Sequence, residues 1–164
     1  PKKEVYLLSP SVFEKESIHK RKDFPKVLTH ELAHLFTYRL YPFFEPHWLI
    51  EGLAYCLASQ GRRDSLKKIK ISPEDFLSKI DTQKGWRGNL HNGAYQLSYL
   101  FVDFLMKKFS KEKLLKLLKS LDFSYEKTRF TQVFKQVYQQ DLDFLQNRFA
   151  KKISLKNQKR KEVR

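Results

Sequence analysis

The residues with the clearest chemical meaning are His30, Glu31 and His34, which form the pattern His-Glu-x-x-His. On a helix, residues four positions apart lie on one face, so the two imidazoles can bind one Zn²⁺ together. The glutamate between them lies close enough to act on a water bound to that metal. Chance alone produces this pattern in roughly one chain of this length in a couple of hundred, so the motif needs a second element.

That second element is Glu51, in the stretch Trp48-Leu-Ile-Glu51-Gly-Leu-Ala54. Gly52 within a helix costs about 1 kcal/mol relative to alanine, so its place beside a carboxylate indicates the close approach of another backbone or a bulky group. Two antiparallel helices joined by a short loop can bring Glu51 opposite the two histidines. Each residue also has an alternative without metal: each histidine could be an ordinary core or surface residue, and Glu51 could be a solvated charge.

Two helices must position these side chains. The first begins after Asp23, a candidate cap, has Pro25 in its first turn and continues to about Tyr41. The second is expected to begin near Pro46 and to end at Gly61. The two histidines lie on one face of the first helix, next to the core side, and a different, apolar face is formed by Leu28, Leu32, Leu35 and Phe36.

The whole chain predicts a mainly α fold, or an α+β fold if N-terminal strands form a small sheet. Val5 to Leu8 is the best strand candidate and Leu66 to Ile71 a weaker one, whereas the chain beyond residue 72 has mostly helical patterns. We therefore expect one domain over residues 1–150. Its successive parts are an edge-strand region, the two site helices and a helical C-terminal part, at residues 1–24, 25–61 and 72–150.

The two motifs, His-Glu-Leu-Ala-His and Trp-x-x-Glu-Gly-x-Ala, together resemble those of the gluzincin zinc peptidases, most closely the peptidase-MA-like and minigluzincin domains. The resemblance covers most of the chain. It implies that one catalytic Zn²⁺ is bound by His30, His34 and Glu51, that Glu31 is the catalytic base, and that the substrate is a peptide or protein. Some gluzincins carry an acidic residue four positions after the third ligand; Tyr55 stands there instead, so the ligand histidines must be oriented by other means.

Three protein ligands would leave one zinc position for water, which is the arrangement of a catalytic site. Peptide hydrolysis also needs a donor for the developing oxyanion. Tyr95 is the first candidate and His91 the second, because both lie where a loop rich in Gly and Asn, residues 85–93, enters the next helix. Core packing for Tyr95 and an exposed loop position for His91 are the alternatives. An extended peptide would bind along a sheet edge, with Val5 to Leu8 as the candidate.

The net charge of +15 indicates either a solvated basic surface or attraction to an anionic partner. The segment from Lys151 to Arg164 contains seven Lys and Arg residues and one Glu, and is expected to be a flexible basic tail. A membrane or an envelope polymer is a better candidate for the anionic partner than nucleic acid. Nucleic-acid binding would place stacking aromatics among the basic residues, whereas here they fall mainly at helical core spacing.

No apolar run in the chain approaches the length of a membrane span, and no signal peptide is recognisable. The chain begins at Pro1, which suggests a fragment or a processed form, and its compartment is unknown. One cysteine, Cys56, excludes an intramolecular disulfide. Three functions remain open: a zinc peptidase, a catalytically silent gluzincin-like binding or accessory module of a larger protein, and an anionic-surface binder whose His-Glu-x-x-His pattern is accidental.

Overall fold

The computed structural model describes residues 8–43, 45–61, 69–121 and 126–162, with side chains to residue 155. These residues form helices and connecting segments, and none of them lies in a strand, which confirms the mainly α expectation for this part of the chain. The candidate strand from Val5 to Leu8 lies outside the described residues except for Leu8. Of the weaker candidate, only residues 69–71 are described, and they are not a strand.

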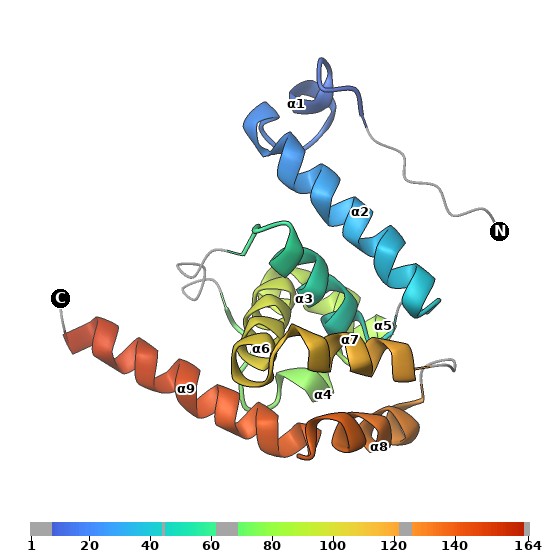
Figure 1. The fold of residues 1–164 in the computed structure, drawn as a ribbon. Helices are drawn as coiled ribbons and strands as arrows, with labels where there is room; N and C mark the ends of the chain where they lie inside the picture. Colours follow the sequence, from blue (N-terminus) through green and yellow to red (C-terminus); the bar gives the residue numbers. More distant parts are fainter. Residues whose placement is uncertain (1–7, 44, 62–68, 122–125, 163–164) are drawn as a thin grey trace.

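The helices follow one another along the chain and are joined mostly by short connections (Figure 1). Their bounds are α1 (Phe13–Glu16), η1 (Arg21–Asp23), α2 (Phe24–Leu40), α3 (His47–Leu57), α4 (Phe76–Ile80), α5 (Gln83–Gly88), η3 (Leu90–Asn92), α6 (Ala94–Phe109), α7 (Lys111–Ser120), α8 (Lys127–Tyr138) and α9 (Leu142–Glu162).

The hydrophobic core lies between α3 and the helices that follow it, and α3 packs most extensively on α6. Trp48 of α3 is fully buried, and its ring centroid lies 5.3 Å from that of Phe101 and 6.0 Å from that of Phe130. A Cβ atom on Gly52 would lie 2.5 Å from the Ser98 carbonyl oxygen of α6. This confirms that the glycine beside Glu51 marks the close approach of another backbone, and it fixes how deeply α3 sits on α6.

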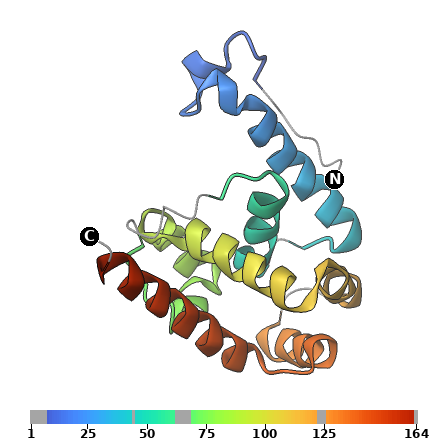
Figure 2. The same ribbon diagram turned by 60° about the vertical axis from the view of Figure 1, so that its left-hand side comes forward.

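Helix α2 lies outside this core and runs along α3 (Figures 1 and 2). Within α2, Ala33 and Thr37 are the buried residues. The apolar face seen in the sequence is largely turned to solvent, since Leu32 is 39% exposed and Phe36 is 62% exposed. The physical reason is that α2 contacts α3 through the face that carries its histidines, where small side chains allow close packing, and this leaves the leucine-rich face outside.

Several element boundaries differ from the sequence expectation. Helix α3 ends at Leu57 rather than near Gly61, because Ser59 has a positive φ of 50°. Asp23 precedes α2 but makes no side-chain capping hydrogen bond. Residues 85–93, expected to be a loop, instead contribute to α5 and η3. There the Thr82 side chain accepts a hydrogen bond from the Gly85 N–H and caps α5.

The C-terminal segment also differs from expectation, because α9 continues through Glu162 where a flexible tail was predicted after Ala150. One face of the helix is held against the core by Phe149 and Ile153, which are 1% and 5% exposed, and lysine, arginine and glutamine are good helix formers.

Across the described residues, no helix combines the length and the apolar character that a bilayer crossing requires.

Candidate metal centre

The candidate metal centre lies between α2 and α3, where three ligand atoms converge. The Nε2 atoms of His30 and His34 are 3.0 Å apart. One carboxylate oxygen of Glu51 lies 3.4 Å from Nε2 of His30, and the other lies 3.7 Å from Nε2 of His34. The chain therefore brings together, from two helices, the three residues that the sequence singled out as metal ligands, and they form a group able to hold a metal ion.

The spacing of these atoms suits a zinc ion. Zinc bonds of about 2.0–2.1 Å in a tetrahedral arrangement place neighbouring ligand atoms about 3.3–3.4 Å apart. The three separations in this cluster, between 3.0 and 3.7 Å, bracket that value. Two imidazoles and one carboxylate are also a donor set that zinc uses in catalytic sites, with a fourth position left open. The residues present thus fit the ion in donor chemistry and in spacing.

The centre is largely shielded from solvent. The side chains of His30, His34 and Glu51 are 12%, 18% and 21% exposed. Burial lowers the pKa of His34 below its usual 6.5, an effect that His30 reinforces and that Glu51 and Glu31 partly offset. A lowered pKa keeps this imidazole neutral, which is the form that binds metal.

The two histidines of the cluster are held by packing. The Nδ1 atoms of His30 and His34 are both buried, and neither has a hydrogen-bond partner among the described residues. The ring of Tyr55 instead stands edge-on to the ring of His30, with the centroids 5.0 Å apart. The contact to the His30 ring from this side is therefore aromatic.

Glu31 adjoins His30 in α2, and Tyr95 contacts Tyr55, which in turn contacts His30. Burial raises the pKa of Tyr95, and the negative charges of Glu51 and Glu31 raise it further, so its phenol is close enough to both carboxylates to respond to them. Tyr95 is half-buried in the first turn of α6, which begins after Gly93 in the left-handed conformation with φ 103°. The first candidate for an oxyanion donor therefore lies next to Tyr55, whose ring contacts His30.

His91, the second candidate donor, is exposed in η3. No hydrogen bond, ion pair or ring contact within the described part of the chain joins it to the centre. His91 is therefore better described as an exposed histidine than as a donor beside the candidate centre.

Sequence reasoning missed an array of aromatic rings that extends from the centre. Tyr55 stacks near Tyr95 with ring centroids 5.4 Å apart, Tyr95 meets Trp86 at 5.0 Å, and Trp86 meets His47 at 5.6 Å. Burial raises the pKa of Tyr55 to about 12, and Tyr95 and Glu51 add to the effect. The spacing of Tyr55 four residues after Glu51 was the available signal, because it places both on one face of α3.

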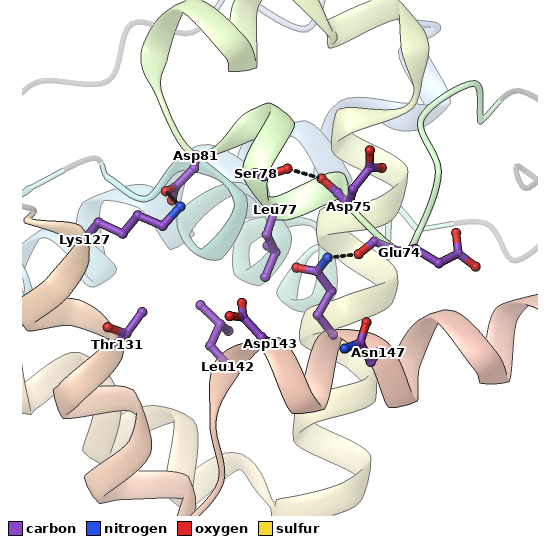
Figure 3. Close-up of a pocket in the computed structure, with 11 residues that line it drawn as sticks. Glu74, Asp75, Leu77, Ser78, Asp81, Lys127, Thr131, Leu142, Asp143 and Asn147 are labelled. Atoms are coloured by element: carbon purple, nitrogen blue, oxygen red, sulfur yellow. Dashed lines mark hydrogen bonds and ion pairs between the residues drawn. The ribbon is translucent and has the colours of Figure 1, made fainter.

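A cavity of about 330 Å³ lies elsewhere, between α4, α8 and α9 (Figure 3). Among the residues that line it, Lys127 pairs with Asp81 at 3.0 Å, and the Gln146 amide donates to the Glu74 carbonyl. Asp75 pairs with Lys79, also at 3.0 Å. Within the described ranges, His30, His34 and Glu51 form the group that could hold a metal ion, and none of them lines this cavity.

Comparisons with protein-family models, with curated proteins and with solved structures found no match for this chain. The assignment of a candidate metal centre therefore rests on the geometry and donor chemistry of its residues.

Proposed function

We propose that this protein is a zinc-dependent peptidase of the gluzincin type, in which His30, His34 and Glu51 hold one Zn²⁺. The observation that carries the proposal is the convergence of their ligand atoms, 3.0–3.7 Å apart, from two different helices. The resemblance of the two sequence motifs to gluzincin motifs supplies the reaction class, and the spacing of the atoms supports the ligand set.

When bound, the metal supplies Lewis acidity at the open position and lowers the pKa of a water there to about 7. Glu31 follows the ligand His30 directly in α2, and its charge is felt at both His34 and Tyr95. In this proposal Glu31 takes the proton of the attacking water and passes a proton to the leaving amine.

Tyr95 would act as the donor to the oxyanion that develops on the scissile carbonyl. The raised pKa of its phenol keeps the hydroxyl protonated, which is the form that can donate a hydrogen bond. The charges of Glu51 and Glu31 contribute to that raised pKa, which supports a role for Tyr95 near the cluster.

The second candidate function is a catalytically silent binding or accessory module that keeps the metal centre. The observation that favours it is the absence of a strand from the described residues, which leaves no sheet edge there along which an extended peptide could pair. The predicted edge strand, Val5 to Leu8, falls mainly outside those residues. Zinc binding is common to both functions, so only a measurement of hydrolysis separates them.

The test is to compare wild-type protein with Glu31→Gln after both have been loaded with zinc. The substitution removes the base but no ligand, so zinc content should stay at one per chain. Cleavage of a mixture of fluorogenic peptides should fall by about a hundred- to ten-thousand-fold. Glu112→Gln is the matched control, because Glu112 is exposed on α7, and it should cleave as wild type does.

Two outcomes would contradict the proposal, the first in its choice of base and the second in its reaction. Equal cleavage by wild type and Glu31→Gln would show that Glu31 is not the base. Stoichiometric zinc in a wild-type protein that cleaves no peptide in the mixture would favour the silent module.

A further inference from the structure

An exposed surface stripe on α9 combines positive charge with apolar side chains. It consists of residues that recur at helical spacing and are all exposed, and we call it the α9 outer stripe: Phe144, Arg148, Lys151, Lys152 and Leu155. The opposite face of the same helix packs into the core through Leu145, Phe149 and Ile153. The helix is therefore anchored on one side, and it presents the stripe outward on the other.

Two cations of the stripe, Arg148 and Lys152, form a cluster with Lys108 of α6, the neighbouring helix. The Lys108 ammonium lies 6.0 Å from the ring centroid of Phe104, and the Lys152 ammonium lies 5.5 Å from the same centroid. Both charges are thus held over one ring. The positive charges of Arg148 and Lys152 also lower the pKa of Lys108, after the larger effect of desolvation.

These cations lack a neutralising partner in the described part of the chain. Lysines elsewhere pair with aspartates, as Lys107 does with Asp103 at 2.6 Å and Lys135 does with Asp141 at 2.9 Å. Lys108, Arg148 and Lys152 instead contact aromatic rings, with Arg148 lying 5.8 Å from the centroid of Phe144. Cations gathered in this way repel one another, so an anionic surface placed against them would stabilise the arrangement.

The apolar members of the stripe distinguish one class of anionic partner from another. Phe144 is 51% exposed and Leu155 is 59% exposed, one at each end of the basic residues. A lipid surface can take up both properties, because phosphate and carboxylate headgroups pair with the cations while the apolar side chains enter the boundary below them. A nucleic acid would use the cations and would leave the leucine without a partner.

We propose that the α9 outer stripe, together with Lys108, docks the protein on a membrane surface that contains anionic lipids. The stripe is a surface contact and crosses no bilayer. Helices α9 and α2 lie at opposite ends of the molecule in both views (Figures 1 and 2), so the stripe and α2 lie on different parts of the molecule. The proposal does not depend on the proposed peptidase, and its test needs no activity.

The test measures co-sedimentation of the whole protein with vesicles. One set is phosphatidylcholine alone, and in the other about a third of the lipid is phosphatidylserine, at physiological salt. Wild type should associate with the anionic vesicles and not with the neutral ones. Arg148→Glu combined with Lys152→Glu should weaken that association by at least about tenfold. Each cation near such a surface strengthens association by about fivefold, so the loss of two exceeds tenfold.

The matched control reverses the same number of charges on α5, with Lys84→Glu and Arg87→Glu, both at exposed positions outside the stripe. If this control weakens association as much as the α9 variant does, net charge alone is responsible and the docking surface is wrong. Equal association of wild type with neutral and anionic vesicles would also overturn the proposal. Circular dichroism of both variants shows whether helix content is retained.

A second variant separates lipid from free polyanions. Phe144→Ser combined with Leu155→Ser keeps every charge and removes the apolar members of the stripe. It should weaken vesicle association severalfold and leave binding to inorganic polyphosphate, which has no bases to stack, unchanged. If the vesicle association is unchanged, the cations bind anions without inserting, and the membrane assignment fails.

Discussion

The ring of Tyr55 stands edge-on to the ring of His30, with the two centroids 5.0 Å apart. Tyr55 lies one helical turn after Glu51 on α3, so a single helix supplies both the third candidate ligand and the side chain that packs against the first. Neither histidine has a hydrogen-bond partner for Nδ1 among the described residues. The orientation of His30 therefore depends on an aromatic contact.

This contact predicts that Tyr55→Ala weakens zinc binding by about ten- to a hundredfold, because an unsupported ligand must be ordered when the metal binds. Tyr55→Phe keeps the ring and should bind zinc nearly as tightly as wild type. Competition with a chelator of known affinity measures both constants. If phenylalanine is as damaging as alanine, the hydroxyl and not the ring contact supports the site.

The close packing of α3 on α6 predicts that Gly52→Ala destabilises the fold by about 1–3 kcal/mol. Its Cβ would meet the backbone of Ser98, which cannot move without shifting α6. Because Gly52 adjoins Glu51, zinc affinity should fall as well. Gly88→Ala is the control, since a Cβ there meets nothing within 4 Å, and its urea midpoint should equal or exceed that of wild type. Equal midpoints for all three proteins would contradict the packing argument.

The position of Tyr95 predicts that Tyr95→Phe lowers kcat by about a hundred- to a thousandfold while zinc content is unchanged. The substitution removes the hydroxyl and keeps the ring that contacts Tyr55 and Trp86. KM should change little, because the donor acts on charge that develops in the transition state. If His91→Ala causes this loss and Tyr95→Phe does not, the oxyanion donor has been assigned to the wrong residue.

The lowered pKa of His34 predicts a pH dependence of stability in the metal-free protein. As the pH falls below about 6.5, the unfolded chain takes up this proton before the folded chain does, so stability is lost toward the folded pKa. In His34→Gln that contribution is missing. We compare the unfolding free energy of wild type minus that of the variant, measured with urea and a chelator. This value should become smaller, or more negative, as the pH falls. A difference that grows at low pH would mean that the folded pKa is raised.

The sequence was sufficient to predict the ligand cluster and the first site helix. The bounds of α2 follow from Pro25 in its first turn and Pro42 after it, and the juxtaposition of Glu51 with the histidines follows from two helices and a short loop. The prediction about Gly52 succeeded because a costly residue in a helix usually has a packing reason. These rules concern residues close together in the sequence, so they can be applied without knowledge of the tertiary structure.

The features that the sequence did not predict depend on tertiary contacts. Helical spacing identified the apolar face of α2 but not which face would meet α3, and Phe36 is exposed as a result. The basic segment after Ala150 reads as a tail on composition alone, whereas Ile153 and its neighbours hold α9 against the core. The support of His30 by Tyr55 joins two helices, and no periodicity within one helix reveals such a contact.

The central claim is that His30, His34 and Glu51 bind one zinc ion. Elemental analysis of the purified protein after dialysis against trace zinc, combined with zinc-edge anomalous diffraction, tests it most directly. We expect one zinc per chain between α2 and α3, lost in His34→Ala and in Glu51→Ala and retained in the control His19→Ala, whose residue is exposed. The absence of stoichiometric zinc from the wild-type protein would contradict the claim. So would a double variant, with His34 and Glu51 both replaced by alanine, that keeps its zinc.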